Sequence, residues 1–343
     1  MANYKLVDID QLEADLTMVA DAIRSKTGTT GTLAFPTAMK VAINNIPGHE
    51  YEDAMIQAGT TFDYVNSRVS QVGGTMGSPF KGFFGIRNAS FANCLTIGTG
   101  AFSSCANLSK IYFPKCTYIK DYAFYSCGKI SGTITFPLCS YIGSSAFHYC
   151  KSIAKISFPE VITIGSGAFS SCSALTSANF PKCTTLGTGA FYGCSKLSYL
   201  NIPSCALISP STFYGCSGIS NSLNFNICTQ VNVNAFYSCK LIPAINLPVC
   251  ESIGAYAFYH CTSLSVINIP NCTFIGACAF YSCSLLSSIQ LSGSTVCTLS
   301  ASNAFQYTGI TSSTGTIYVP ASLVNSYKTA TNWVYFSNRI FEK

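Results

Sequence analysis

Charged residues are scarce in this sequence: only 9% of its 343 residues are Asp, Glu, Lys or Arg, against about a quarter in typical soluble domains. Hydrophobic residues nevertheless make up 48% of the chain. Intrinsic disorder needs the opposite balance, with high charge and low hydrophobicity, so the composition excludes it. Serine, threonine, asparagine and tyrosine must supply much of the polar surface, which is typical of a stacked β structure.

Basic charge is thinly spread. The net charge of +6 arises between residues 98 and 310, where nine lysines, no arginine and three acids occur. Nucleic-acid binding normally needs clustered cations to neutralise phosphates, so we expect no nucleic-acid partner.

Long apolar runs and a secretion signal are also missing. No run reaches the roughly 18 residues that a membrane helix needs, so we expect no membrane insertion. The first 16 residues mix acidic and apolar side chains and lack the continuous apolar segment of a signal peptide. We therefore expect synthesis in the cytoplasm and an extracellular or virion-associated role, reached by lysis or particle assembly.

Phenylalanine and cysteine recur with a period of 22 residues, stretched to 23 twice. The phenylalanines are Phe102, Phe124, Phe147, Phe169, Phe191, Phe213, Phe236, Phe258 and Phe280, and each has a cysteine three residues later. A fixed period of this length predicts a solenoid, in which one small unit stacks on copies of itself.

One repeat unit spans residues 108–127. Its first nine residues follow the pattern L-x-x-I-x-F-x-x-C, a strand that buries Ile111 and Phe113 and exposes Tyr112. Pro114 ends that strand because proline cannot donate to a β-ladder. Residues 123–127 are expected to form a tight helical turn. Gly98, Gly143, Gly165, Gly187, Gly254 and Gly276 recur before this turn, where a small residue or a positive φ is needed.

The composite pattern I-G-x-x-A-F-x-x-C-x-x-L-x-x-I-x-F-P resembles the BspA-type leucine-rich repeat family over roughly residues 82–320. The resemblance implies a mainly β fold with short helical turns: a curved, right-handed solenoid with a parallel sheet on one face. It also implies surface proteins concerned with adhesion and recognition, and it implies no enzymatic activity.

The 19 cysteines favour buried thiols over disulfides or metal ligands. A second series falls midway between the first and gives a rhythm of about half a turn: Cys116, Cys139, Cys183, Cys205, Cys228, Cys250 and Cys272. Val161 replaces one member, as expected if the thiol acts as a small hydrophobe. Neighbouring turns about 4.8 Å apart would hold Cβ atoms too far apart for ordinary disulfides. Cys278 and Cys297 lie outside both series and are the predicted exposed thiols; a few disulfides remain the alternative.

Two outward columns are the candidate ligand-binding residues. The strand column contains Tyr112, Asn179, Asn201, Asn224, Asn246, Asn268 and Gln290. The column that follows the phenylalanines contains Tyr192, Tyr214, Tyr237, Tyr259 and Tyr281, preceded by Tyr125, His148 and Ser170. Each column has two compatible interpretations: stabilisation by stacking along the solenoid, or a surface for glycans or proteins.

The two ends are expected to differ from the repeats. Residues 1–48 are predicted to form a helical hairpin for attachment or homo-oligomerisation, and residues 49–81 a transition and N-terminal cap. Residues 20–26 and 33–36 resemble a segment at the start of prophage tail-associated structural proteins. Repeats should occupy residues 82–311. A C-terminal cap should occupy residues 312–343, with a last strand at 317–320, a helix at 322–329, and Trp333, Tyr335 and Phe336 sealing the core.

Catalysis is not expected. The repeats hold only three acids and two well-separated histidines, His148 and His260, and there is no C-x-x-C motif. We therefore expect no catalytic, cofactor-binding or metal-binding residues. The favoured function is recognition of a cell-surface protein or glycan through the solenoid face, and its finer form is a receptor-binding component of a phage or prophage tail. The alternatives are a structural spacer, or an adhesin exported by its own cell.

Overall fold

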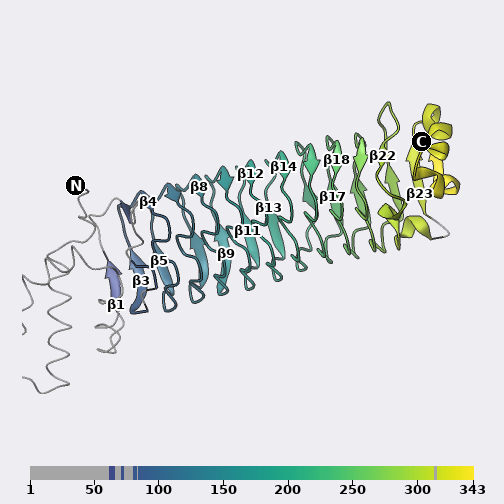
Figure 1. The fold of residues 1–343 in the computed structure, drawn as a ribbon. Coiled ribbons are helices and arrows are strands. Elements are labelled where there is room, and N and C mark those ends of the chain that lie inside the picture. Colours follow the sequence, from purple (N-terminus) through teal and green to yellow (C-terminus); the bar gives the residue numbers. More distant parts are fainter. Residues whose placement is uncertain (1–61, 66–70, 73–79, 83, 313–314) are drawn as a thin grey trace, which may run out of the picture.

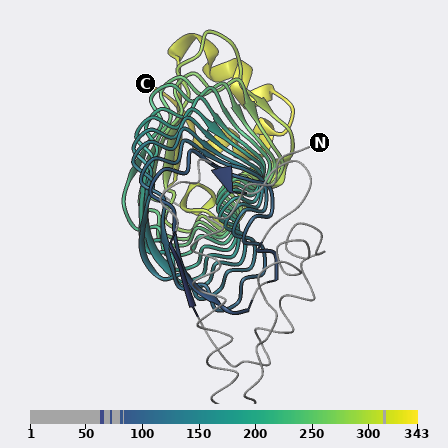
Figure 2. The ribbon, with the colours of Figure 1, turned by 90° about the vertical axis from the view of Figure 1, so that its left-hand side faces the viewer.

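The computed structural model describes residues 62–65, 71–72, 80–82, 84–312 and 315–343. The described chain forms one elongated rod of stacked turns (Figure 1). Viewed from the N-terminal side after a quarter turn, successive turns overlie one another around a common interior (Figure 2). The helical hairpin expected at residues 1–48 and most of the transition at 49–81 lie outside the described residues.

Each turn contributes two short parallel strands. The first strands are β1 (Phe62–Val65), β3 (Ile86–Ser90), β5 (Lys110–Tyr112), β7 (Gly132–Thr135), β9 (Ile153–Ser157), β11 (Ser177–Asn179), β13 (Tyr199–Asn201), β15 (Leu223–Asn224), β17 (Ala244–Asn246), β19 (Val266–Asn268) and β21 (Ser288–Gln290). The second strands are β2 (Gln71–Val72), β4 (Thr96–Ile97), β6 (Tyr118–Ile119), β8 (Tyr141–Ile142), β10 (Thr163–Ile164), β12 (Thr185–Leu186), β14 (Leu207–Ile208), β16 (Gln230–Val231), β18 (Ser252–Ile253), β20 (Phe274–Ile275) and β22 (Thr298–Leu299).

Two sides of the rod therefore carry β-sheet, whereas the sequence predicted a sheet on one face. The second strands form one continuous 11-stranded parallel sheet from β2 to β22. The first strands form four shorter sheets: β1-β3-β5, β7 to β13, β15 to β19, and β21 with two C-terminal strands. The mainly β, parallel solenoid is confirmed.

The two 23-residue steps coincide with breaks in the first-strand side. In the step from β5 to β7 the inserted residue lies beside Gly132, at φ +80°, and the pairing of β7 with the following strand, β9, shifts register between Gly132 and Thr133. Between β13 and β15, the side chain of Asn221 accepts a hydrogen bond from the Leu200 N–H at 3.2 Å and donates one to the Leu200 carbonyl at 3.1 Å. Asn221 thus satisfies backbone groups that a paired strand would otherwise bond.

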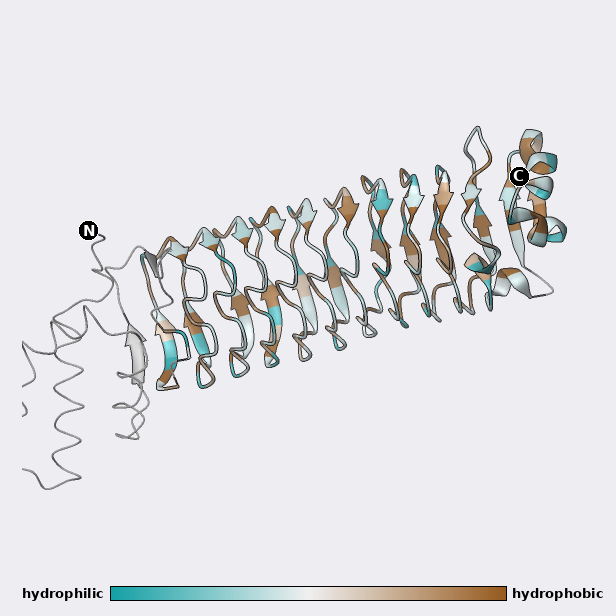
Figure 3. Cartoon of the chain, viewed as in Figure 1, coloured by the Kyte–Doolittle hydropathy of each residue, from teal (hydrophilic) through white to brown (hydrophobic). Residues whose placement is uncertain are grey.

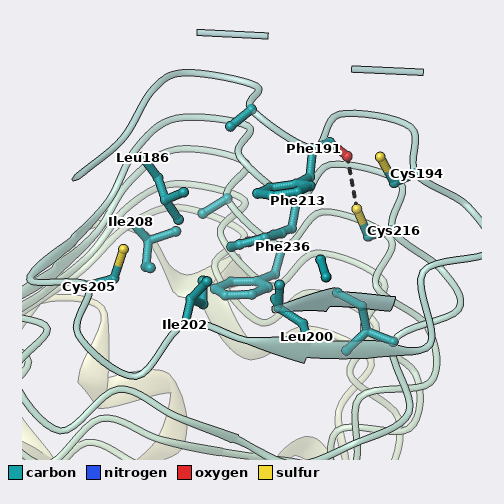
Figure 4. Packing of buried hydrophobic residues seen from close by; sticks show 14 of the residues in the cluster. Leu186, Phe191, Cys194, Leu200, Ile202, Cys205, Ile208, Phe213, Cys216 and Phe236 are labelled. Atoms are coloured by element: carbon teal, nitrogen blue, oxygen red, sulfur yellow. Dashed lines mark hydrogen bonds between the residues drawn. The ribbon is translucent and has the colours of Figure 1, made fainter. Parts of the chain in front are cut away.

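Phenylalanine rings form the spine of the core. The ring of Phe213 lies between those of Phe191 and Phe236, with centroids 5.6 and 5.1 Å away and planes within 20° of parallel. Figure 4 shows this stack between Leu186 and Ile208, from the second strands, and Leu200, from a first strand. A second stack, from the strand position of Phe113, meets the first edge-on at 5.9 Å from Phe102. Figure 3 shows that hydrophobic residues recur in every turn along the rod.

The segment after each second strand from β4 to β20 is a series of tight turns, not the helical turn expected from the sequence, and a short helix, η1 (Ser302–Phe305), follows β22. Two positions per turn adopt left-handed backbone conformations, which interrupt any helix. In the turn that contains Phe124, these residues are Tyr122 at φ 57° and Ser126 at φ 58°. The Cys127 N–H instead donates to the Phe124 carbonyl, three residues back, at 3.1 Å.

The recurrent glycines are explained by close packing and not by positive φ. Gly187 has no left-handed backbone, but a Cβ placed on it would lie 2.3 Å from the backbone nitrogen of Ser166 in the preceding turn. Gly143, Gly165 and Gly276 have equivalent contacts at 2.4–2.5 Å. A side chain there would force neighbouring turns apart.

All 19 cysteines are buried and none forms a disulfide, as predicted for the two thiol columns. In the first column the Cys216 Sγ–H donates to the Phe191 carbonyl at 3.0 Å, and the same bond recurs along the column. The prediction that Cys278 and Cys297 are exposed was wrong, because they are 7% and 0% exposed. Cys297 extends the second column, although a longer connection before it breaks the regular spacing. The C-terminal cap covers it there. The Trp333 indole N–H donates to the carbonyl of Cys297 at 2.6 Å.

The C-terminal cap closes the core with strands, short helices and aromatic rings. It contains η1 (Ser302–Phe305), η2 (Gly309–Thr311), β23 (Thr316–Val319), η3 (Ala321–Leu323), α4 (Val324–Thr329), η4 (Trp333–Arg339) and β24 (Ile340–Glu342). The predicted last strand is therefore not the last, because β24 pairs in parallel with β23. Trp333 and Phe336 are buried as expected, but Tyr335 is 73% exposed and does not seal the core.

Candidate recognition surface

The strand column lies where the sequence placed it, on the outer face of the first-strand side. Asn179 pairs in register with Asn201 on the neighbouring strand, and Asn246 pairs with Asn268. Tyr112 is exposed at the N-terminal end of the column, and Gln290 pairs with Tyr318 at the other end. The repeat thus brings these uncharged groups into one line, because each occupies the same strand position.

Hydrogen bonds within the strand column are discontinuous. The side chain of Asn201 donates to Asn179 at 2.7 Å, and that of Asn268 donates to Asn246 at 2.6 Å. Asn246 donates to Asn226 at 3.3 Å, although its register partner on the neighbouring strand is Asn224. The asparagines that pair spend part of their hydrogen-bonding capacity on one another. This agrees with the first interpretation of the column, stabilisation by stacking along the solenoid.

The five tyrosines form a stacked ladder, which we call the tyrosine ladder: Tyr192, Tyr214, Tyr237, Tyr259 and Tyr281. Successive ring centroids are 4.8, 4.5, 4.7 and 4.9 Å apart, with planes within 12° of parallel. The rings cover one another's faces and leave their edges to solvent. Burial raises the pKa of Tyr237, and the neighbouring hydroxyls of Tyr214 and Tyr259 add to this effect, so its phenol stays protonated at neutral pH.

Three further aromatic residues flank the ladder and were missed in the sequence. Tyr256 lies 5.7 Å from Tyr259, His260 lies 4.6 Å from the same ring, and Tyr307 meets Tyr281 edge-on at 5.0 Å. All three occupy left-handed backbone positions. Their signal was available, because they stand two residues before or two residues after a core phenylalanine. We call the ladder together with Tyr256, His260 and Tyr307 the aromatic edge.

His148 continues the same column at the other side of Ser170. Its ring stacks on Tyr125 at 5.2 Å and meets Tyr149 at 4.3 Å. Its Nδ1 is buried with no hydrogen-bond partner, and burial lowers the pKa of the imidazole. The ring is therefore neutral at physiological pH and behaves as part of the aromatic packing.

The thiols are poorly suited to nucleophilic chemistry, which requires an accessible thiolate. Burial raises the pKa of Cys139 to about 12, with opposing hydrogen bonds from backbone groups. Burial likewise raises the pKa of Cys250 to about 12. Within the described ranges, no three His, Cys, Asp or Glu side chains gather in a way that could hold a metal ion. The described helices include none with the length and apolarity needed to span a bilayer.

The sequence profile described as "BspA type Leucine rich repeat region" matches residues 95–220 and 206–325, with six copies. The chain belongs to this family. The matched residues span the turns from β4 to β22 and the first strand of the C-terminal cap, β23. A search among curated proteins found no match to this chain.

Several solved structures resemble this BspA-type repeat protein. A leucine rich cell surface protein from Faecalibacterium prausnitzii is 23% identical, with 52% of this chain and 58% of that chain covered and a TM-score of 0.36. A leucine-rich repeat protein from Eubacterium ventriosum is 17% identical, with 79% and 87% covered and a TM-score of 0.39. The pneumococcal vaccine antigen PcpA is 14% identical, with 82% and 85% covered and a TM-score of 0.39. The BspA-type assignment rests on the family match and on the repeat geometry.

Proposed function

We propose that this protein is a non-catalytic recognition or adhesion protein that binds a cell-surface protein or glycan through the outer surface of its solenoid. The observation that carries the proposal is the tyrosine ladder, where identical uncharged groups are repeated in line at the surface. Such repetition allows several weak contacts to act together, which raises avidity without a deep pocket. Membership of the BspA-type family supports the same proposal.

Binding of the fluorescently labelled full chain to a panel of bacterial and animal cells tests this function. Saturable binding that excess unlabelled protein displaces is the expected result. A protein that binds no cell in the panel would instead support the alternative of a structural spacer.

Triple substitution of Asn201, Asn224 and Asn246 by alanine asks whether the strand column contributes to binding. Lost binding with unchanged melting would assign recognition to this face. A large fall in melting temperature with binding intact would show that the amides mainly stabilise the stack.

The finer form of the proposal is a receptor-binding component of a phage or prophage tail, acting outside the cell that makes it. Its support is the resemblance of residues 20–26 and 33–36 to tail-associated proteins. This form predicts that the chain co-sediments with tail particles after induced lysis, with residues 1–48 as the attachment or oligomerisation segment. Export from intact cells without particles would favour a cellular adhesin.

A further inference from the structure

The C-terminal part of the rod is almost free of charge. Residues 197–327 contain only two charged side chains, Lys240 and Glu251. The N-terminal turns differ, because six of the nine lysines fall between residues 110 and 155. Most of the aromatic edge lies in this uncharged part, and only Tyr192 precedes it. A charged partner would find few opposite charges to pair with on such a surface. A neutral partner could bind to it without removing water from charged side chains, which would cost free energy.

The aromatic edge offers free ring surfaces beside a row of hydroxyls. Tyr192 is 42% exposed, and the column member on its other side is the small Ser170. Tyr256 and Tyr307 are 40% and 61% exposed. Within the ladder, by contrast, the ring faces cover one another, so that the phenol edges remain for hydrogen bonding. Free aromatic faces and hydroxyls together match the two kinds of surface that a sugar ring presents, its C–H face and its hydroxyl groups.

Backbone strain supports a functional role for the flanking aromatics. Tyr256, His260 and Tyr307 have φ values of 57°, 57° and 59°. Side chains with a Cβ disfavour this region. Glycine occupies it at Gly167 and Gly189, which are equivalent to Tyr256, and at Gly193 and Gly215, which are equivalent to His260 and Tyr307. Serine, glycine or asparagine fills most of these positions in the other turns, so the backbone conformation does not require the exposed rings of Tyr256, His260 and Tyr307.

We infer that the aromatic edge binds an uncharged polysaccharide laid along the axis of the rod. This inference rests on the proposed recognition function and selects both the face and the ligand class. The ladder presents one phenol per turn at a nearly constant spacing, so a polymer with regularly repeated hydroxyl groups can contact several turns at once. The asparagine column is a weaker candidate because its members partly bond to one another.

Native affinity electrophoresis of the full chain tests the inference, with mannan, xyloglucan or mixed-linkage β-glucan as neutral probes and heparin as the acidic probe. We expect retardation by at least one neutral polymer, and an affinity that changes less than about twofold between low and high salt because no ion pairs form.

The decisive variant is Tyr256→Gly with Tyr307→Gly. It should weaken binding about tenfold, since each lost aromatic contact is worth up to about tenfold in affinity. Its melting temperature should stay the same or rise, because glycine relieves the left-handed strain. The matched control is Tyr199→Ser with Tyr318→Ser, which removes two exposed tyrosines from the first-strand side and should bind normally.

Two results would overturn the inference while leaving the proposed function intact. The first is binding to cells, to heparin or to a protein without affinity for any neutral polysaccharide. The second is unchanged polysaccharide binding by the glycine variant. Failure to bind both cells and polysaccharides would remove the proposed function as well.

Discussion

Alkaline pH should unfold this protein well before its thiols ionise in the folded state. Eleven buried cysteines have pKa values raised above the ordinary value of 9.0. Burial is the largest cause at nine of them. At Cys205 and Cys272 the largest cause is a hydrogen bond with a neighbouring thiol, Cys183 and Cys297 respectively.

The direction of this pH effect on stability follows from the number of protons that the folded and unfolded states bind. Above pH 9 the unfolded chain loses thiol protons that the folded chain keeps, so the free energy of unfolding falls as pH rises. The stabilisation is fully present below about pH 9 and is lost as pH rises towards the folded-state values, about 12 for Cys139 and Cys250. At pH 10 each thiol whose folded-state pKa lies well above 10 costs about 1.4 kcal/mol, so ten thiols, all of the eleven except Cys228, cost about 14 kcal/mol. Whole-protein stabilities are about 5–15 kcal/mol, so unfolding is expected near pH 10.

Urea unfolding followed by circular dichroism at a series of alkaline pH values measures this loss. The matched control replaces Cys139 and Cys250 by valine, because Val161 already fills one position of the same column and is fully buried. The control should lose about 2.8 kcal/mol less at pH 10, which separates the thiols from other titrating groups. Thiolate absorbance that rises near pH 9 while the native signal persists would contradict the raised thiol pKa values, and so would unfolding midpoints that do not change between about pH 8 and 10.

Other substitutions test the packing. Phe213→Ala removes a ring stacked at 5.6 and 5.1 Å on its neighbours and should cost about 3–5 kcal/mol in urea unfolding; a loss under about 1 kcal/mol would contradict the stack. Gly187→Ala, whose Cβ would lie 2.3 Å from a backbone nitrogen, should cost about 1–3 kcal/mol or more, whereas Gly293→Ala, which meets only an ordinary contact at 3.7 Å, should stay within about 0.5 kcal/mol of the native chain. Asn221→Ala should cost about 1–3 kcal/mol in the same urea unfolding by removing two hydrogen bonds to the Leu200 backbone, and a change within about 0.5 kcal/mol would contradict their role.

Periodicity made most of the repeat architecture predictable. The spacing of Phe102, Phe124 and their successors identified the turn, and the alternation of Ile111, Tyr112 and Phe113 identified the first strand. The second-strand sheet was missed because its strands are mostly two residues long, too short to show an alternating pattern.

Local backbone geometry was the least predictable part of the fold. The segment from Ala123 to Cys127 has helix-compatible residues, yet left-handed positions beside and within it divide it into separate turns. These conformations are set by stacking against neighbouring turns: the Phe124 N–H donates to the Ala146 carbonyl of the next turn at 2.7 Å. Tertiary contacts of this kind override local propensity.

The alignment of the candidate residues into columns was predictable from the sequence, but the aromatic residues that lie beside those columns were not. The alignment of the ladder from Tyr192 to Tyr281 was predictable, because identical positions in identical turns must align. It did not show that Tyr256 and Tyr307 flank the ladder, since their placement depends on a left-handed backbone. The burial of Cys297 was missed for a related reason, because a longer connection before it shifted the count.

Distances between spin labels along the continuous sheet test the in-register stacking most directly. One spin label would be attached to a keto amino acid incorporated at Thr163. The second would be placed, in three separate variants, at Gln230, Ser252 or Phe274, which lie three, four and five turns away in the same register. Parallel strands about 4.8 Å apart predict distances of about 14, 19 and 24 Å between the Cα atoms, rising in equal steps. Distances that do not increase with the number of turns would contradict the stacked columns and every surface built on them.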